Sequence, residues 1–228
     1  MGIKHRLSSV NKLLEVKRNR VVLKQSESNS EKLLGCVIQS ELKWGNHVAM
    51  LCSKLKKRLA ALRCLRYSCP FTVRRRVAEG IFNSVLSYCL PLFGGMQKSQ
   101  MNEIQVLQSQ AARLTCNAAP RTKRKNLFQH IGWLTVKQLI SYHTLIAIFS
   151  IRIHKVPEYL AEKLATDGRN GRIRLQNPQL SITADSFCFR GGSLWNKLPE
   201  DLRNELKIGS FKSKVKKWIL ENIHRFDE

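Results

Sequence analysis

Apolar side chains recur every three or four residues along two neighbouring segments of the chain. In the first segment they are Val48, Leu51, Cys52, Leu55, Leu59, Leu62 and Leu65. In the second segment they are Val73, Val77, Ile81, Val85 and Tyr88. This spacing places each set on one side of an α-helix that faces a core. We expect the second helix to begin near Thr72, as its N-cap, after the break at Cys69-Pro70.

The same periodicity predicts three more helices further along the chain. One runs from Gln100 to Cys116 behind a Ser99 N-cap, with Ile104, Leu107, Ala111 and Leu114 on its inner face. The most apolar one spans 135–153 and starts with a capping box formed by Thr135 and Gln138. The last begins near Ser210 and buries Phe211, Val215, Trp218 and Ile219, a face that we expect to dock on residues 133–153.

Other segments carry different patterns. Val21 to Leu23 and Leu33 to Ile38 predict the two strands of an antiparallel hairpin, joined by the polar run 25–31. A short helix is expected within residues 1–19. Gly, Asn, Arg and Ser dominate residues 166–192, which predicts an irregular arm, and Pro199-Glu200-Asp201 fits the first turn of a short helix.

The predicted fold class is mainly α: a helical bundle preceded by a small antiparallel β-hairpin and followed by a helical C-terminal extension. We expect three regions along the chain. They are a helix and hairpin at 1–46, a helical domain at 47–119, and an extension at 120–228 that contains the arm 166–192.

The net charge of the chain indicates what class of partner to expect. The 228 residues include 40 Lys and Arg against 16 Asp and Glu, a formal net charge of +24, and 43% are hydrophobic, which is enough for a core. Such a charge attracts phosphate backbones through counterion release. An anionic membrane surface is the rival partner, but helices that lie on membranes need no globular core. Nucleic acid is therefore the expected partner, with no membrane.

The cations are concentrated on the predicted helices. Lys54, Lys57 and Arg58 edge one side of the first apolar stripe, and no acidic residue occurs between Lys43 and Arg76. Cations in the first turn of a helix oppose its dipole and suit a bound polyanion. Mere solvation of exposed faces is the alternative, although a solvated face usually mixes both signs. The candidate nucleic-acid-binding residues are Lys54, Lys57, Arg58, Arg63, Arg74, Arg75, Arg113, Arg121, Lys123, Arg124 and Lys125.

Several classes of site are not indicated. The seven cysteines are odd in number, scattered and without a CxxC pair, which favours free thiols in a reducing compartment over zinc binding. No signal sequence is evident, and the apolar stretch 145–153 is too short to cross a bilayer. We expect an intracellular protein, nuclear or cytoplasmic; the cluster 121–125 resembles a nuclear-import signal as well as a phosphate contact. We expect His130 and His143 to have structural roles. The sequence indicates no catalytic residue, no metal site and no small-molecule substrate.

One segment resembles a known family. Leu34-Gly35-Cys36-Val37-Ile38-Gln39-Ser40-Glu41-Leu42-Lys43-Trp44, followed by His47, resembles the LGV-x-x-D-x-x-L-x-W-x-x-H segment of non-LTR (LINE-type, jockey-like) retrotransposon reverse transcriptases. Further similar strings follow in the family's order, so that the resemblance covers roughly residues 30 to 220. They are Ser87-Tyr88-Cys89, Gly94, and the segments 107–113, 132–136, 157–160 and 186–199.

The resemblance implies that residues from His47 to about Asn117 correspond to the thumb, which in that family grips the RNA/DNA template–primer duplex. The remainder would be a C-terminal extension, and the missing fingers and palm would be a further partner. The parent enzymes use Mg²⁺ held by paired palm aspartates. The aspartates of this chain are Asp167, Asp185, Asp201 and Asp227, none adjacent to another. We therefore expect a polymerase fragment that needs no cofactor and is inactive alone.

Two alternatives come from other classes of protein. The chain could be a decayed or repurposed fragment that binds a protein partner and has no polymerase role. It could also be an unrelated basic RNA-binding protein, but that class needs aromatic platforms or Lys/Arg-Gly-Phe strings, which the sequence does not display.

Overall fold

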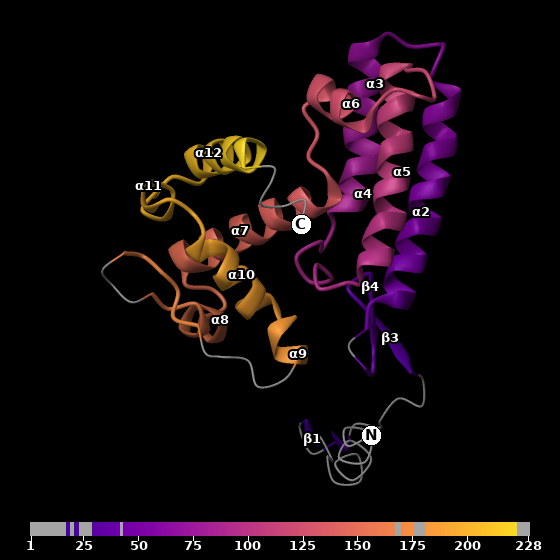
Figure 1. The fold of residues 1–228 in the computed structure, drawn as a ribbon. Helices are drawn as coiled ribbons and strands as arrows, with labels where there is room; N and C mark the ends of the chain where they lie inside the picture. Colours follow the sequence, from indigo (N-terminus) through magenta and orange to yellow (C-terminus); the bar gives the residue numbers. More distant parts are fainter. Residues whose placement is uncertain are drawn as a thin grey trace.

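The computed structural model describes residues 17–18, 21–22, 29–41, 43–166, 170–175 and 181–222. This part of the protein is mainly helical and has small antiparallel strand pairs ahead of its first long helix (Figure 1). The fold class predicted from the sequence is therefore confirmed. The short helix expected within residues 1–19 lies outside the described residues, except that Lys17 and Arg18 form strand β1.

The hairpin next to the helices is tight. Strand β3 (Ser30–Leu33) pairs antiparallel with strand β4 (Cys36–Gln39) along its whole length. Leu34 and Gly35 join them with φ angles of +48° and +84°. Two consecutive positive φ angles are typical of the hairpin turns whose twist matches that of the flanking strands.

The pairing of strands differs from the prediction. Strand β2 (Val21–Val22) pairs with β1 (Lys17–Arg18), and not with residues 33–38. The prediction of one continuous strand over 33–38 was wrong because the chain turns inside this apolar run. Leucine rarely occupies a position of positive φ, so Leu34 gave no sign of the turn.

A bundle of helices follows the hairpin. Helices α2 and α5 run side by side in the same direction, and the segment α3–η1–α4 runs antiparallel to both (Figure 1). Helix α6 packs across one end of α5. The bounds are α2 (Gly45–Cys64), α3 (Phe71–Ala78), the π-helical turn η1 (Glu79–Asn83), α4 (Ser84–Ser87), α5 (Lys98–Cys116) and α6 (Arg124–Ile131).

The inner face of α2 agrees with the periodicity of the sequence. The six predicted residues from Val48 to Leu62 are buried, and on α5 Ile104, Leu107 and Ala111 are buried with them. Helix α5 starts earlier than predicted, at Lys98. Its N-cap is Gln97, which forms a capping box with Gln100, and the prediction of Ser99 as N-cap was wrong.

The predicted inner face of the second helix is confirmed in part: Val77, Ile81 and Val85 are partly buried against the core, but the fully buried positions lie one residue further along. The buried residues are Ala78, Phe82, Leu86 and Leu90, whereas the predicted Val73 and Tyr88 are exposed. The π-helical turn at 79–83 widens the helix, so that residues four apart stay on one side of it. The helix also begins at Phe71 after a Pro70 N-cap, and Thr72 therefore lies in its first turn rather than capping it.

Helix α7 (Val136–His154) connects two hydrophobic cores. The predicted capping box is present, because the Gln138 backbone N–H donates to Thr135 Oγ1 at 3.3 Å and the Thr135 N–H donates to Gln138 Oε1 at 2.9 Å. The first turns of α7 contribute Val136 and Ile140 to the core of the bundle. Its later turns belong to a second core further along the chain.

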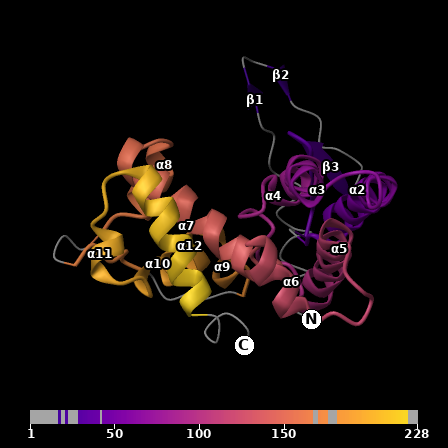
Figure 2. The same ribbon diagram turned by 90° about the horizontal axis from the view of Figure 1, so that it is seen from above.

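The second core lies in a C-terminal unit of short helices around the later turns of α7 (Figure 2). The fully buried Trp195 packs its ring 5.7 Å from that of Phe211, which stacks on Phe149 of α7 at 4.2 Å. The last helix docks on α7 as predicted but begins at Ile208 rather than Ser210. The bounds are α8 (Glu158–Lys163), α9 (Ser181–Ala184), α10 (Phe187–Asn196), α11 (Glu200–Arg203) and α12 (Ile208–Glu221).

Part of the predicted irregular arm is helical. Helix α10 begins inside the range 166–192, and its Gly191 and Gly192 are buried. A Cβ on Gly191 would lie 2.6 Å from Ile148 Cδ1, so the glycine allows α10 to approach α7 closely. The extent of the arm was predicted wrongly because glycines that serve close packing look like loop residues in the composition.

The segment Arg124–His154 is long and apolar enough to span a membrane by length and composition alone. It consists of α6 and α7 with a break between them, and half of its most apolar window is buried inside the protein. Core helices commonly satisfy the same test, so the segment by itself is weak support for a membrane span.

Candidate nucleic-acid interface

The outer side of α2 carries three of the predicted cations. Burial of the apolar stripe of α2 turns Lys54, Lys57 and Arg58 outward, and all three are exposed. None of the three forms an ion pair within the described ranges. Lys54 lies close enough to His47 and Cys36, at the hairpin end of the helix, to affect the pKa of both. These three cations therefore lie along the outer side of α2, from its middle toward the hairpin end.

The other eight predicted cations come together at the opposite end of the bundle. There the turn 65–70 between α2 and α3 lies beside the loop 117–123 that connects α5 to α6 (Figure 1). We call this region, with the adjoining helix ends, the basic end. Its predicted members are Arg63, Arg74, Arg75, Arg113, Arg121, Lys123, Arg124 and Lys125.

Arg74 has a structural role at the basic end. Its guanidinium donates to the backbone carbonyls of Thr115 at 2.9 Å and Arg66 at 3.1 Å, and also to that of Cys69. Arg74 therefore ties the turn between α2 and α3 to the last turn of α5. Its Nε and Nη1 donors are occupied by carbonyl groups, which leaves it less available to a phosphate than its neighbours.

Arg75 and Arg113 are partly engaged. Arg75 Nε donates to Glu79 Oε1 at 3.0 Å, one helical turn further on, and its guanidinium also lies near Gly132 at the end of α6. Arg113 Nε is buried and has no hydrogen-bond partner among the described residues. Both side chains are only half-exposed.

The remaining cations of the basic end face solvent. Arg63, Arg121, Lys123, Arg124 and Lys125 are all exposed, and none forms an ion pair in the described part of the chain. Two of them lie in the first turn of α6, which has no acidic residue and no side-chain cap. The positive end of the helix dipole thus adds to their charge, an arrangement that a bound anion stabilises.

Acidic side chains do little to neutralise this charge. Between Lys43 and Val136 only Glu79 and Glu103 are acidic. Glu79 pairs with Arg75, and Glu103 lies beside the buried Cys52 thiol. Burial, and then Glu103, raise the pKa of Cys52 to about 12. The exposed cations therefore dominate the electrostatic potential of the bundle.

The histidines do not form a site with these cations. His47 Nδ1 accepts a hydrogen bond from the Val37 N–H at 3.2 Å, and burial followed by Lys54 lowers the pKa of His47. Burial, and then Lys212, lower the pKa of His143. The His130 ring packs 5.1 Å from that of Phe71. All three histidine rings therefore contact neighbouring residues of the folded chain.

The described residues do not fit a magnesium site. They contain no group of three or more His, Cys, Asp or Glu side chains close enough to hold a metal ion. All seven cysteines are free thiols, as predicted. Burial and the neighbouring Cys89 raise the pKa of Cys36 to about 11, so its thiol is protonated at neutral pH.

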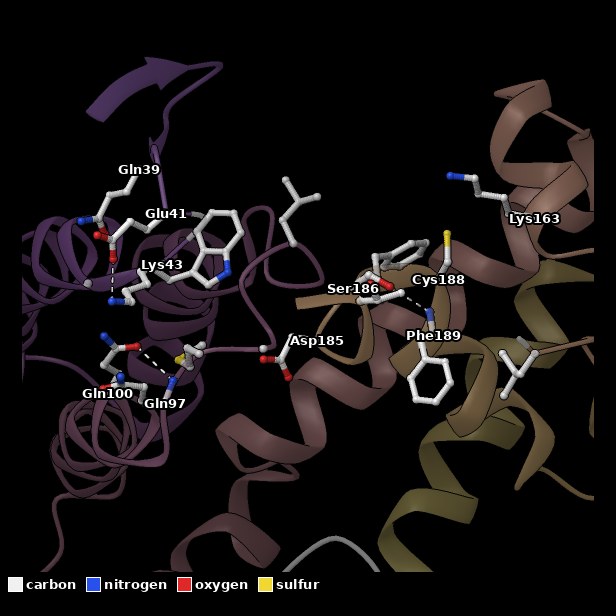
Figure 3. Close-up of a pocket in the computed structure, with 18 of the residues that line it drawn as sticks. Gln39, Glu41, Lys43, Gln97, Gln100, Lys163, Asp185, Ser186, Cys188 and Phe189 are labelled. Atoms are coloured by element: carbon white, nitrogen blue, oxygen red, sulfur yellow. Dashed lines mark hydrogen bonds and ion pairs between the residues drawn. The ribbon is translucent and has the colours of Figure 1, made fainter. Parts of the chain in front are cut away.

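A cleft of about 1330 Å³ lies between the bundle and the C-terminal unit (Figure 3). Its charged lining is balanced, since Glu41, Glu162 and Asp185 stand against Lys43, Lys163 and Arg174. Lys43 already pairs with Glu41 at 2.6 Å. A cleft with balanced charge is a poor match for a polyanion, and the basic end remains the better candidate interface.

Two residues of the basic end were absent from the predicted set. Arg66 and Tyr67 follow Leu65, the last apolar position of the first helix, and Tyr67 is strongly exposed. An aromatic residue outside the periodic stripe and just before a Cys-Pro break was the available signal. The predicted set was built on positive charge, which a tyrosine does not carry.

Comparisons with known proteins identify one informative relative. No family model matches the chain, and no solved structure matches it. Over 141 residues the chain is 27% identical to a Drosophila melanogaster protein described as "Probable RNA-directed DNA polymerase from transposon BS". The match covers 60% of this chain and 15% of that protein. The chain therefore contains a region related to part of a transposon reverse transcriptase.

Proposed function

We propose that this chain is part of a LINE-type, jockey-like reverse transcriptase and that its helical bundle is the thumb, which holds the template–primer duplex. The family's motifs occur in the same order along this chain, and the similarity to a transposon polymerase supports the same origin. Helices α7 to α12 would then belong to the C-terminal extension of the polymerase.

The gathering of cations at the basic end carries this proposal. Arg63, Arg121, Lys123, Arg124 and Lys125 are exposed and unpaired within the described residues, and the row on α2 continues toward the hairpin. Phosphate contacts of this kind position a duplex without reading its sequence. The thumb would therefore bind an RNA/DNA hybrid through its backbone, whatever its base sequence.

Binding is the proposed activity of this chain, and polymerisation is not. Nucleotide addition needs carboxylates that hold two divalent metals, and the described residues offer no such group. Primer extension by the purified chain with Mg²⁺ and nucleotides should give no product. Extension that survives further purification would contradict this part of the proposal.

A salt titration tests the binding. The affinity of the chain for a short RNA/DNA hybrid, measured by fluorescence anisotropy, should fall linearly on a log–log plot as the salt concentration rises. The slope should be about 0.9 per phosphate neutralised on a duplex. An affinity that stays flat between low and physiological salt would contradict the proposal.

A protein-interaction role is the second candidate, and the hairpin favours it. Leu34 is 82% exposed at the tip of the β3–β4 turn, and Leu33 and Tyr88 beside it are also exposed. Tyr88 Oη donates to the Leu34 carbonyl at 2.6 Å, which holds these apolar side chains together. The partner would be the fingers and palm of the polymerase or, in a repurposed fragment, another protein. A chain with this role alone would show no salt-dependent binding to the hybrid.

A further inference from the structure

The turn between α2 and α3 holds an aromatic side chain in solvent among the cations of the basic end. Tyr67 is 79% exposed, so its ring contributes little to either hydrophobic core. Arg63 precedes it by one helical turn, and the loop with Arg121 and Lys123 starts from the residues that Arg66 contacts. The ring therefore lies on a turn that adjoins the exposed cations of the basic end.

Arg66 holds one face of this ring. Its guanidinium carbon lies 5.1 Å from the centroid of the Tyr67 ring, a cation–π contact. The same guanidinium donates from Nε to Asn117 Oδ1 at 2.8 Å and from a terminal nitrogen to the Ala118 carbonyl at 3.4 Å. Arg66 is thus fixed by the end of α5, and it covers one face of the tyrosine while the rest of the ring stays in solvent.

The backbone under the ring is also fixed. Arg74 donates to the carbonyls of Arg66 and Cys69, which flank Tyr67 on both sides within the turn. Single exposed apolar residues are common and need no explanation by themselves. Here two arginines hold the turn and the ring, and such preorganisation lowers the entropy lost on binding.

Given the proposed function, we infer that Tyr67 is a stacking platform for an unpaired nucleobase. Proteins that bind single-stranded nucleic acid commonly combine a free aromatic face with nearby cations. The basic end would then hold a place where a single strand leaves a duplex, with Arg63 and Arg121 on the phosphates and Tyr67 on the first unpaired base. The inference rests on the proposed function and makes its ligand more specific.

The experiment compares two probes that share one duplex. The first is a blunt RNA/DNA hybrid, and the second is the same hybrid with a short single-stranded overhang that carries 2-aminopurine at its first unpaired position. The wild-type chain should bind the overhang probe more tightly and should quench the 2-aminopurine fluorescence, because stacking quenches this base. Tyr67→Ala should weaken binding to the overhang probe about tenfold. Its affinity for the blunt probe should fall much less, because a blunt end offers no unpaired base to stack on the ring.

Matched variants separate stacking from other effects. Tyr67→Phe keeps the ring and should retain the overhang preference and the quenching, whereas Tyr67→Leu should lose both. Tyr159→Ala is the control, because Tyr159 is also an exposed tyrosine, at 61%, but lies on α8 in the C-terminal unit. It should behave like the wild type. Since Tyr67 lies outside both cores, the thermal unfolding of its variants should match that of the wild type.

The possible outcomes separate this inference from the proposed function. Salt-dependent binding of both probes with no effect of Tyr67→Ala, or an equal effect on both, would overturn the stacking role alone. Binding of neither probe at low salt would overturn both proposals. An overhang preference that Tyr67→Phe loses as fully as Tyr67→Ala would also overturn the inference, because the phenol oxygen would then be the group that matters.

Discussion

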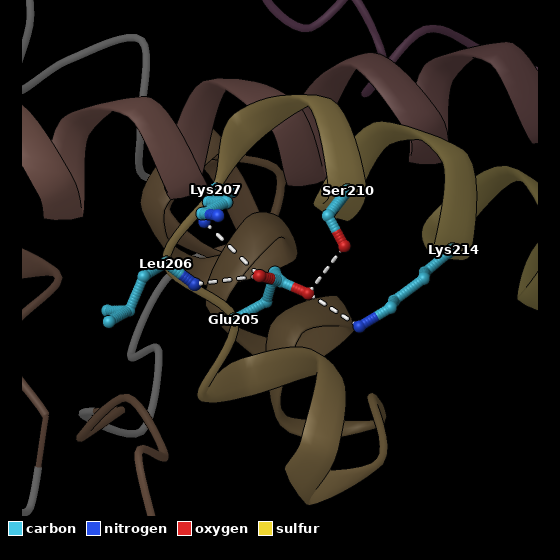
Figure 4. Close-up of polar contacts among 5 residues, drawn as sticks. All are labelled: Glu205, Leu206, Lys207, Ser210 and Lys214. Carbon is cyan, nitrogen blue, oxygen red and sulfur yellow. Dashed lines mark hydrogen bonds and ion pairs between the residues drawn. The ribbon is translucent and has the colours of Figure 1, made fainter.

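The bundle and the C-terminal unit use their basic side chains differently. In the C-terminal unit, Arg152 covers the Trp195 ring at 4.5 Å, and Arg190 donates to the carbonyls of Asp185 and Pro91. Lys214 there pairs with Glu205 at 2.6 Å (Figure 4). Arg152 and Lys214 stabilise the unit to which they belong, whereas Arg190 also ties this unit to the bundle at Pro91.

In the bundle the same residue types divide into two groups. Arg66 and Arg74 hold loops through backbone carbonyls and Asn117, whereas Arg63, Arg121 and Lys123 remain in solvent with no partner among the described residues. The number of arginines therefore does not mark a binding surface. Our proposal therefore rests on the arginines and lysines that remain exposed and make no structural contact.

The largest expected effect is on the stability of the C-terminal unit. Trp195→Ala should lower the free energy of unfolding by about 3–5 kcal/mol. The reason is that it removes a fully buried ring and leaves the Gly171 carbonyl without its donor, Trp195 Nε1 at 3.0 Å. Urea denaturation followed by circular dichroism measures this loss. In the folded range, affinity for a blunt hybrid should stay near that of the wild type, since the cations lie elsewhere. A parallel loss of affinity would break the proposed division of roles.

A structural arginine of the bundle comes next. Arg74→Met should cost about 2–3 kcal/mol of stability, because three carbonyls lose a charged donor. Arg76→Met is the matched control; it removes the same charge from an exposed position nearby and should stay within about 0.5 kcal/mol of the wild type. Thermal unfolding of both variants measures the difference, and equal losses would contradict the structural role of Arg74.

Neutralising exposed cations of the basic end should affect binding and spare stability. The triple variant Arg63→Gln, Arg121→Gln and Arg124→Gln should bind the hybrid about tenfold more weakly, or about 1.4 kcal/mol. The salt dependence should fall by about one unit of slope for each lost phosphate contact. Fluorescence anisotropy over a salt series measures both quantities.

The control for that variant lies on the other unit. Lys207→Gln, Lys212→Gln and Lys216→Gln remove three exposed charges from α12 and the residue before it. If net charge alone drives binding, both triple variants will lose the same affinity. A larger loss from the basic-end variant is expected, because the position of the charges matters for contacts with a duplex.

The smallest expected effect is a pH dependence in the C-terminal unit. Lys214 and Ser210, together with two backbone N–H groups, hold the pKa of Glu205 at about 2, below its ordinary 4.5 (Figure 4). Because the pKa is lowered in the folded state, the stabilisation is complete above pH 4.5 and is lost as the pH falls toward 2. Urea midpoints measured from pH 5 downward should fall more steeply for the wild type than for Glu205→Gln. Parallel curves would contradict this contribution.

The regular helices could be predicted from the sequence because their cause is local. The inner face of α2 follows a period of 3.6 residues, and the Thr135–Gln138 capping box needs only two side chains at the right spacing. The inner face of the second helix was misplaced because its apolar residues stand in adjacent pairs (Val77-Ala78, Ile81-Phe82 and Val85-Leu86), and a spacing of four residues fits either member of each pair.

The site was less predictable than the fold because its parts are brought together by tertiary contacts. Arg74 and Arg75 are neighbours with the same side chain, yet one reaches the Thr115 carbonyl, 41 residues away, and the other a glutamate on its own helix. The α2–α3 turn and the 117–123 loop meet only in the folded bundle. Helix α10 likewise depends on Gly191 meeting Ile148 of α7, a contact that composition does not reveal.

Helix α7 has a mechanical consequence for the whole molecule. Val136 and Ile140 anchor its beginning in one core, and Leu145 and Phe149 anchor its later turns in the other. The two cores are therefore joined by a continuous helix and not by a flexible linker that a protease could cut. Any rotation of one unit relative to the other would have to bend helix α7 and its backbone hydrogen bonds. A force applied to α12 would therefore be transmitted through α7 to the bundle and its basic end.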